Sequence, residues 1–240
     1  MKLDNLLLIS SSDVDDFLAC LLKKNKPTSL GFLNQHGYNL ICNDENIFNS
    51  FNDLDVIFRD GKGIELACKY FGLNPGANLN GTDYIPHIIS FIKSNANCDI
   101  VFFAYGTSDP WLTVGASALF DTSGIHLLDG FLPDTDYLDN FNEHASPGKV
   151  NIVVLGMGMP KQEKIARLLK SNSSGNTIII CGGAIFDFLG GKFDRAPMLL
   201  QRLGFEWLYR LIKEPKRLSK RYLIGIPIFF FNVFKNKITF

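Results

Sequence analysis

The sequence predicts an α/β fold, in which helices cover both faces of a parallel sheet and a helical, basic appendage follows at the C-terminal end. Short runs that are almost wholly apolar alternate with stretches of helical periodicity, a pattern typical of parallel strands buried on both faces. The strand pattern stops near residue 195, where basic and aromatic residues interleave. The composition, with 46% hydrophobic and 20% charged residues in 240, excludes a disordered chain and is enough for a large core.

The elements before residue 100 begin with a helix and then alternate between strand and helix. The Ser12–Asp15 sequence predicts a helix N-terminus, because apolar residues follow it at helical spacing. A further helix is expected at Tyr84, with Thr82 or Asp83 as its N-cap. Between these two helices the expected elements are Ser29–Leu33 (strand), Asp44–Phe51 (helix), Leu54–Phe58 (strand) and Gly63–Phe71 (helix).

The clearest strands of the chain are Val150–Leu155 and Thr177–Cys181, and the helix Pro160–Lys170 is expected between them. Its proline falls in the first turn, where a missing N–H group breaks no helical hydrogen bond. The elements that precede this unit are expected at Ile100–Ala104 (strand), Pro110–Phe120 (helix) and Ile125–Leu128 (strand).

The charges are distributed unevenly, although the formal net charge is zero. Residues 201–240 carry nine Lys/Arg and two Glu, a net of +7, so residues 1–200 carry a net of −7. We therefore divide the chain into an α/β domain at 1–195 and a membrane-associating helical appendage at 196–240. The apolar Leu223–Phe234 segment is too short to span a bilayer, but it suits a helix lying in the interface of an anionic membrane surface. The alternative is a helix packed on the core, with its basic residues merely solvated.

Several other features indicate the compartment and exclude classes of protein. The zero net charge gives no reason to expect a nucleic acid as partner, and the N-terminus lacks the pattern of a signal peptide. Of three Asp-x-Asp pairs, only Asp134–Asp136, in an expected polar loop, is a plausible metal site, and we expect neither a metal nor a cofactor. Free, buried thiols in a reducing cytoplasm are expected for the cysteines in apolar runs, namely Cys20, Cys42, Cys68 and Cys181.

Polar residues that follow strands are the first candidates for a site, because ligands of open parallel sheets bind beyond the carboxyl ends of the strands. Asp60 follows the Leu54–Phe58 strand, beside glycines that let a ligand approach the backbone. It is a candidate general base, and the alternative is that it N-caps the next helix. Asn34 ends the Ser29–Leu33 strand and is either a contact for a base or sugar or a turn residue.

A second candidate site follows the Val150–Leu155 strand. Gly156 and Gly158 precede a helix N-terminus, which attracts anions through its free N–H groups and its dipole. Gln162 and Glu163 lie in the first turn of that helix and can hydrogen-bond a polar ligand. The dinucleotide fingerprint G-x-G-x-x-G is incomplete, because Lys161 occupies the position of its last glycine. An ordinary tight turn is therefore the alternative.

Several motifs together are more specific than any one of them. They are Arg59-Asp-Gly-x-Gly-Ile64, Gly81-Thr82-Asp83, Leu155-Gly-Met-Gly-Met-Pro-Lys-Gln-Glu163, Gly182-Gly-Ala-Ile-Phe-Asp-Phe-Leu-Gly-Gly191, Arg195-Ala-Pro197 and the basic, aromatic run from Leu203 to Tyr222. In this order and spacing the chain closely resembles the WecG/TagA/CpsF glycosyltransferase family, from about residue 30 to 225 and most densely after residue 150.

The resemblance implies a Rossmann-like sheet and an inverting transfer that needs no metal. The sugar would move from a UDP-sugar to a saccharide on polyprenyl diphosphate, on the inner face of the cell membrane, in bacterial cell-surface polysaccharide synthesis. The family's base falls on Asp60 and its nucleotide-sugar contacts on Gln162 and Glu163. The appendage residues that would face the diphosphates are Arg210, Lys216, Arg217 and Arg221. The other residues that we expect to bind substrate are Asn34, Thr82, Asp83, Gly156, Gly158 and Arg195.

The sequence also departs from the family pattern and leaves other functions open. Members that use N-acetylmannosamine often show Thr-Pro-Asn at the end of the early strand, whereas this chain has Phe32-Leu33-Asn34. The expected donor sugar is therefore N-acetylmannosamine or another hexose, and a homo-oligomer is left open. A nicotinamide-dependent oxidoreductase is one alternative, although no acid for a ribose follows the next strand. A non-catalytic membrane scaffold of a polysaccharide assembly complex, with Asp60 as a mere cap, is the other.

Overall fold

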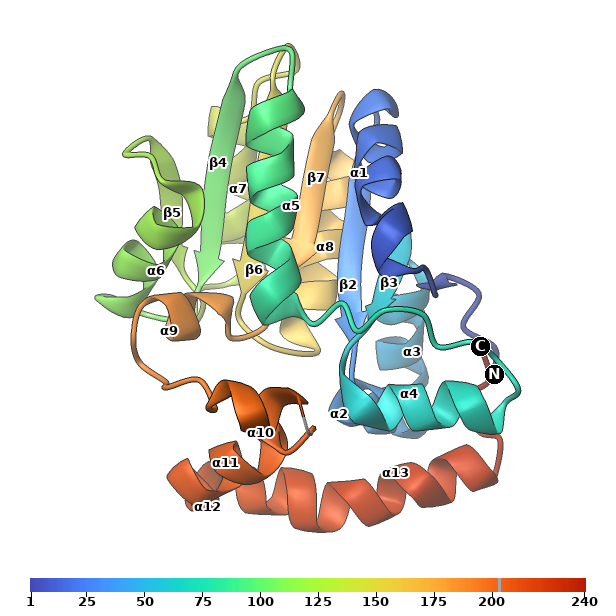
Figure 1. The fold of residues 1–240 in the computed structure, drawn as a ribbon. Coiled ribbons are helices and arrows are strands. Elements are labelled where there is room, and N and C mark those ends of the chain that lie inside the picture. The colour runs from blue at the N-terminus through green and yellow to red at the C-terminus, as the bar shows by residue number, and fades with distance from the viewer. Residues whose placement is uncertain (203) are drawn as a thin grey trace.

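The computed structural model describes residues 1–202 and 204–240, and its centre is a seven-stranded sheet in which all strands run parallel (Figure 1). The strand order is β1-β3-β2-β7-β6-β4-β5. The predicted fold class is confirmed, and the predicted strands all form within a few residues of their expected bounds. The strands are β1 (Leu6–Leu7), β2 (Thr28–Leu33), β3 (Val56–Arg59), β4 (Ile100–Gly106), β5 (Ile125–Asp129), β6 (Val150–Gly156) and β7 (Thr177–Cys181).

Alternate side chains of the central strands enter two separate cores, one on each face of the sheet. In β6, Ile152 and Val154 belong to one core, while Val153 and Leu155 belong to the other. This alternation explains why the strands are apolar almost throughout, since neither face meets water. The first core is closed by α1 (Val14–Lys23), α5 (Gly81–Asn95), α6 (Trp111–Phe120) and α9 (Ile185–Leu189). The second is closed by α2 (Gln35–Asn43), α3 (Glu45–Asn52), α4 (Gly61–Tyr70), α7 (Asp134–His144), α8 (Lys161–Asn172) and α13 (Gly225–Phe234).

The C-terminal part of the chain is helical, as predicted, and lies at the end of the sheet toward which the strands run (Figure 1). The helix α13 packs against α2 and buries Phe229 and Val233 in the second core. Beyond it, Thr239 forms a parallel bridge with Lys2, which places the two chain ends side by side. The last helix is therefore integrated with the α/β body, and the division at residue 195 stays a prediction. The remaining helices of this part are α10 (Met198–Arg202), α11 (Glu206–Lys213), α12 (Pro215–Ser219) and a π-helical turn (Lys220–Ile224).

Three local expectations are wrong, each for a physical reason. The helix α5 begins at Gly81, not Tyr84, because the Asn80 side chain caps it by accepting the N–H of Asp83 at 3.1 Å. Asp134–Asp136 is not in a loop but opens α7, where acidic side chains favour the helix dipole. Cys20 is exposed rather than buried because it lies on the solvent side of α1, whereas Cys68 and Cys181 are buried.

The packing of α13 predicts different effects for two neighbouring phenylalanines. Phe229 is fully buried and meets the Tyr38 ring edge-on at 5.2 Å, whereas Phe231 is 56% exposed. We expect Phe229→Ala to lower the free energy of unfolding by about 3–5 kcal/mol, because it leaves a cavity in the second core. Phe231→Ala should change it by less than about 0.5 kcal/mol. Urea unfolding of both variants measures the difference, and equal effects would contradict the packing of this helix on the core.

Candidate functional site

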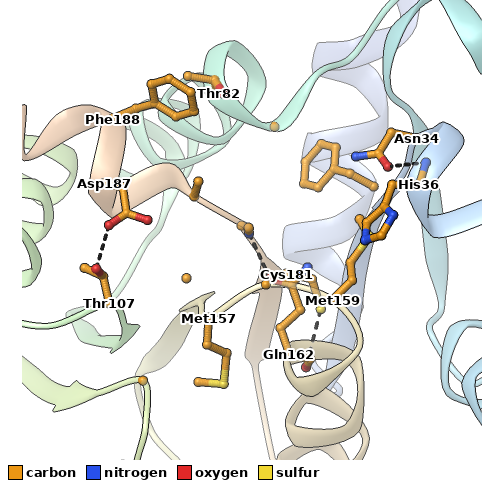
Figure 2. Close-up of a pocket in the computed structure, with 18 of the residues that line it drawn as sticks. Asn34, His36, Thr82, Thr107, Met157, Met159, Gln162, Cys181, Asp187 and Phe188 are labelled. Carbon is orange, nitrogen blue, oxygen red and sulfur yellow. Dashed lines mark hydrogen bonds between the residues drawn. The ribbon is translucent and has the colours of Figure 1, made fainter. Parts of the chain in front are cut away.

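A polar pocket of about 340 Å³ opens where the strands end (Figure 2). Its wall comes from the ends of β2, β3, β4, β6 and β7, which meet at one edge because all of them are parallel. The pocket brings together most of the residues that the sequence nominated. They are Asn34, Asp60, Thr82, Gly156, Gly158, Gln162, Arg210, Arg217 and Arg221.

Asp60 lies between the end of β3 and the start of α4, in the N-cap position, but its side chain makes no capping hydrogen bond. The N–H of Gly61 is bound instead by Oδ1 of Asn78, at 2.8 Å. The Asp60 carboxyl is therefore free of the structural role that the sequence left open. Burial raises its pKa to about 6, although Asn34, Arg221 and Arg210 act to lower that pKa. Such a group is ionised at neutral pH and can accept a proton.

Asn34 caps α2 and also lines the polar pocket, and its contact with a base or sugar stays a prediction. Its Oδ1 caps α2 by accepting the N–H groups of His36 and Gly37, at 3.0 and 3.1 Å. The cap fixes the amide, so that its Nδ2 faces Oδ2 of Asp60 at 3.5 Å. Figure 2 shows this amide beside His36, whose pKa falls to about 4 through burial and the charge of Arg221. The imidazole is therefore neutral, and the charged groups here are Asp60 and the arginines.

Three arginines of the C-terminal part, Arg210, Arg217 and Arg221, reach over the pocket. Arg210 and Arg217 stack on the rings of Phe188 and Phe193, at 5.0 and 4.9 Å. Among the described residues, only Arg217 of the three is paired with an acid of its own segment, through Glu214 at 2.7 Å. The buried Nε atoms of Arg210 and Arg221 have no hydrogen-bond partner among the described residues. Clustered cations with unused donors form a site for an anion such as a phosphate.

The two glycines of the β6–α8 turn have different reasons to be glycine. A Cβ on Gly156 would lie 2.4 Å from the Phe186 ring, so packing requires a glycine at this position. Gly158 has a φ of +78°, and nothing stands near its missing side chain, so it leaves the turn open toward the pocket. Lys161, which interrupts the dinucleotide fingerprint, donates to the carbonyl oxygens of Gly130 and Leu132 and thereby holds the β5–α7 loop.

Four residues that the sequence nominated do not line the pocket, and one of them, Lys216, is an exposed residue of α12. Glu163 is fully buried behind Gln162. Asp83 and Arg195 form an ion pair with each other, and Arg195 also donates to Oε1 of Gln201, at 3.3 Å. This pair ties α5 to the start of the C-terminal helices, so both residues shape the site from outside it.

The pocket also contains a cluster that the sequence did not nominate. Thr107 donates to Oδ1 of Asp187 at 2.6 Å, as Figure 2 shows, and Lys192 donates to the same oxygen at 2.9 Å. Thr107 directly follows β4, so the strand-end rule that identified Asp60 would also have identified it. Asp187 and Lys192 carried no such signal, because both lie in the short irregular segment around α9.

A second pocket of about 400 Å³ adjoins the first and shares Asn34, Asp60, Arg210 and Arg221 with it. Its other walls are more apolar and come mainly from α4 and the C-terminal helices. The aromatic residues among them are Phe205, Trp207, Tyr222 and Phe230. Gln35 also lines this pocket, and its buried Nε2 has no partner among the described residues. Asp60 thus stands where a polar and an aromatic pocket meet.

The C-terminal helices expose large apolar side chains and several lysines to solvent. Those exposed by more than a third are Met198, Leu199, Phe205, Leu208, Ile212, Leu223, Ile224, Ile228, Phe231 and Phe234. We call this set the apolar face. The exposed lysines of the same helices are Lys213, Lys216 and Lys220. Within the described part of the chain, no helix has the length and apolar character to cross a membrane.

The described residues contain no group of three or more His, Cys, Asp or Glu that could hold a metal ion. What the pockets offer is a carboxylate that can take a proton, cations that can neutralise a leaving anion, and room for two ligands on either side of the carboxylate. Residues 5–240, nearly the whole chain, match the model of the glycosyl transferase WecG/TagA/CpsF family. The chain therefore belongs to this family of glycosyltransferases, enzymes that transfer sugars in the synthesis of cell-surface polysaccharides.

Proposed function

We propose that the protein is an inverting glycosyltransferase that moves a hexose, such as N-acetylmannosamine, from a UDP-sugar to a saccharide on polyprenyl diphosphate. The single observation that carries this proposal is the place of Asp60. Its carboxyl makes no helix-capping hydrogen bond, lies at the junction of two pockets and faces Arg210 and Arg221. A transferase that acts in one displacement needs its base between donor and acceptor, and the position of Asp60 between the two pockets supports this role.

The polar pocket suits the sugar nucleotide. The Gly156–Gly158 turn and the N-terminus of α8 present backbone N–H groups, and the arginines add positive charge. As the bond between the sugar and the diphosphate breaks, negative charge grows on the departing oxygen. Groups already fixed around that oxygen stabilise it without reorganisation, which is the usual source of the largest rate effects.

The aromatic pocket suits the acceptor. Trp207 and Tyr222 offer flat apolar surfaces for sugar rings, and Asn78, Asn80 and Gln201 offer hydrogen bonds to hydroxyl groups. Asp60, in the wall of the same pocket, is placed to take the proton of the attacking hydroxyl. A polyprenyl chain must stay in the bilayer, so this pocket has to open near a membrane surface. The apolar face and the lysines of the same helices would dock the enzyme there.

The first prediction concerns Asp60. We expect Asp60→Asn to lower kcat by about 100-fold or more, the scale of a lost general base. Its free energy of unfolding should not fall, because the side chain caps nothing and its burial disfavours the charge. Steady-state transfer from UDP-sugars to a short-chain polyprenyl-diphosphate acceptor in detergent measures the loss. Asp44→Asn, which alters a cap of α3 far from the pockets, is the matched control and should remain active. Full activity of Asp60→Asn would show that Asp60 is not the base, and absence of transfer by the unchanged protein would support a scaffold instead.

The pH dependence follows from the same carboxyl. Burial raises the pKa of Asp60 to about 6, and the base must be ionised to act. The rate should therefore rise as the pH increases from 5 to 7 and then level off, with an apparent pKa near 6. A profile of kcat/KM against pH measures it. A rate that is already constant at pH 5 would mean that another group accepts the proton.

The diphosphate leaves with a negative charge that must be neutralised. We assign this neutralisation to Arg210, Arg217, Arg221 and backbone N–H groups. Activity should therefore survive EDTA, measured in the same transfer assay. Complete loss of activity in EDTA, restored by Mg²⁺ or Mn²⁺, would contradict this assignment.

Replacement of Arg221 by Gln should lower transfer even to a water-soluble acceptor, because the charge acts on the reaction rather than on docking.

The apolar face predicts how the protein meets a membrane. The Leu223→Ser/Phe231→Ser variant removes two side chains that are 63% and 56% exposed, so the fold should be unaffected. Co-sedimentation with anionic liposomes should weaken by about tenfold or more, and high salt should weaken the binding of the unchanged protein. Val114→Ser, at a 50% exposed position on α6, is the control and should bind normally. Unchanged binding of the double variant would overturn the docking role of this face.

A further inference from the structure

Glu163 is a buried acid that the proposed reaction does not use. It lies in the first turn of α8, is completely inaccessible to solvent and lines neither pocket. Burial raises its pKa to about 7. Its Oε2 has no hydrogen-bond partner among the described residues. A buried carboxyl costs stability in such a place, and an apolar side chain would pack there at lower cost. The polar function of Glu163 must therefore be sought in what its other oxygen binds.

That other oxygen, Oε1, accepts a hydrogen bond from Nε2 of Gln162 at 2.8 Å. At the other end of the same amide, Oε1 of Gln162 accepts the N–H of Gly183, also at 2.8 Å. A backbone N–H can only donate, so the amide oxygen has to face Gly183 and the NH₂ group has to face Glu163. The two contacts together fix which way the amide points.

Gln162 lies in the floor of the polar pocket, although none of its surface is accessible to solvent. Gln162 lines it together with Cys181, Gly182 and Gly183 of the β7–α9 turn. The thiol of Cys181 donates to the backbone oxygen of Gln162 at 3.7 Å, so the start of α8 and the end of β7 are joined by side chain and backbone (Figure 2). The NH₂ group carries two hydrogens, and Glu163 accepts one of them. One N–H therefore remains for a ligand in the pocket.

We propose that Glu163 is a positioning residue, which holds the Gln162 amide so that its remaining N–H donates to an oxygen of the bound sugar nucleotide. This inference rests on the proposed function, because it assumes that the polar pocket takes the donor. In this proposal Glu163 does not touch the substrate and acts only through Gln162. A change at Glu163 should therefore cause no further loss of binding once Gln162 has been replaced.

Binding of UDP, followed by calorimetry, tests the coupling. Glu163→Leu removes the acceptor and should weaken UDP binding about tenfold, the scale of one hydrogen bond. Glu163→Gln keeps an acceptor and should stay within about twofold of the unchanged protein. Gln162→Ala combined with Glu163→Leu should bind no more weakly than Gln162→Ala alone. Ile165→Ala is the control, because it makes a cavity in the same helix without touching the amide. It should lower Tm and leave UDP binding unchanged.

The outcomes separate this inference from the proposed function. If Glu163→Leu binds UDP as the unchanged protein does, or if its effect adds to that of Gln162→Ala, Glu163 is not a positioning residue. If the unchanged protein binds no UDP, the donor assignment fails, and a measurement without ligand still decides the role of Glu163. That measurement also serves if Glu163→Leu does not fold.

The ligand-free measurement is the NMR signal of the Gln162 side-chain amide, identified by its loss in Gln162→Ala. The signal should move between pH 6 and 8 as Glu163 ionises, because the carboxyl accepts its hydrogen bond. The Cys181 thiol faces Glu163 from β7, and burial raises its pKa well above this range, so it should not contribute. The movement should disappear in Glu163→Gln. A signal that moves equally in both proteins, or in neither, would overturn the proposal.

Discussion

The parallel direction of all seven strands is the constraint on which the site depends. It brings the carboxyl ends of β2, β3, β4, β6 and β7 to one edge, together with the N-termini of the helices that follow them. Free backbone N–H groups and short polar side chains therefore gather in one place, although they come from distant parts of the sequence. Covering both faces of the sheet with helices leaves this edge as the natural position for a ligand, and both pockets lie there.

The strand edge alone carries little positive charge, and the C-terminal helices supply what is missing. Arg210, Arg217 and Arg221 reach the pocket from elements that pack on the end of the sheet. Their segment stays in position because Phe229 and Val233 enter the second core and because the last residues pair with the first. One segment thus contributes a buried side, an exposed apolar face and the cations of the site. The proposed chemistry at Asp60 and the proposed contact with a membrane would consequently be coupled through the same helices.

Sequence patterns located the strands well because apolar runs bounded by turns reflect burial on both faces, which depends little on the rest of the fold. Strand-end residues such as Asp60 and Asn34 were predictable for the same reason. The short helix α9 was not, since its five residues carry no clear period, and Asp187 was missed with it. Residues nominated by motif alone fared differently: Asp83 and Arg195 satisfy each other in an ion pair. Whether a charged residue faces a ligand or a partner in the protein depends on contacts between distant segments, which spacing does not reveal.

The charges around Asp60 oppose one another, and their balance explains why the carboxyl is neither inert nor permanently protonated. Burial is the largest influence and raises the pKa, with a smaller contribution in the same direction from Glu206. Asn34, Arg221 and Arg210 stabilise the ionised form and keep the pKa near 6. A diphosphate bound to the arginines would weaken their effect on Asp60, because its charge offsets theirs. The pKa of the base should then rise when the donor binds and make it a stronger proton acceptor in the complex than in the free enzyme. The arginines that we propose to neutralise the leaving group would in this way also adjust the pKa of Asp60.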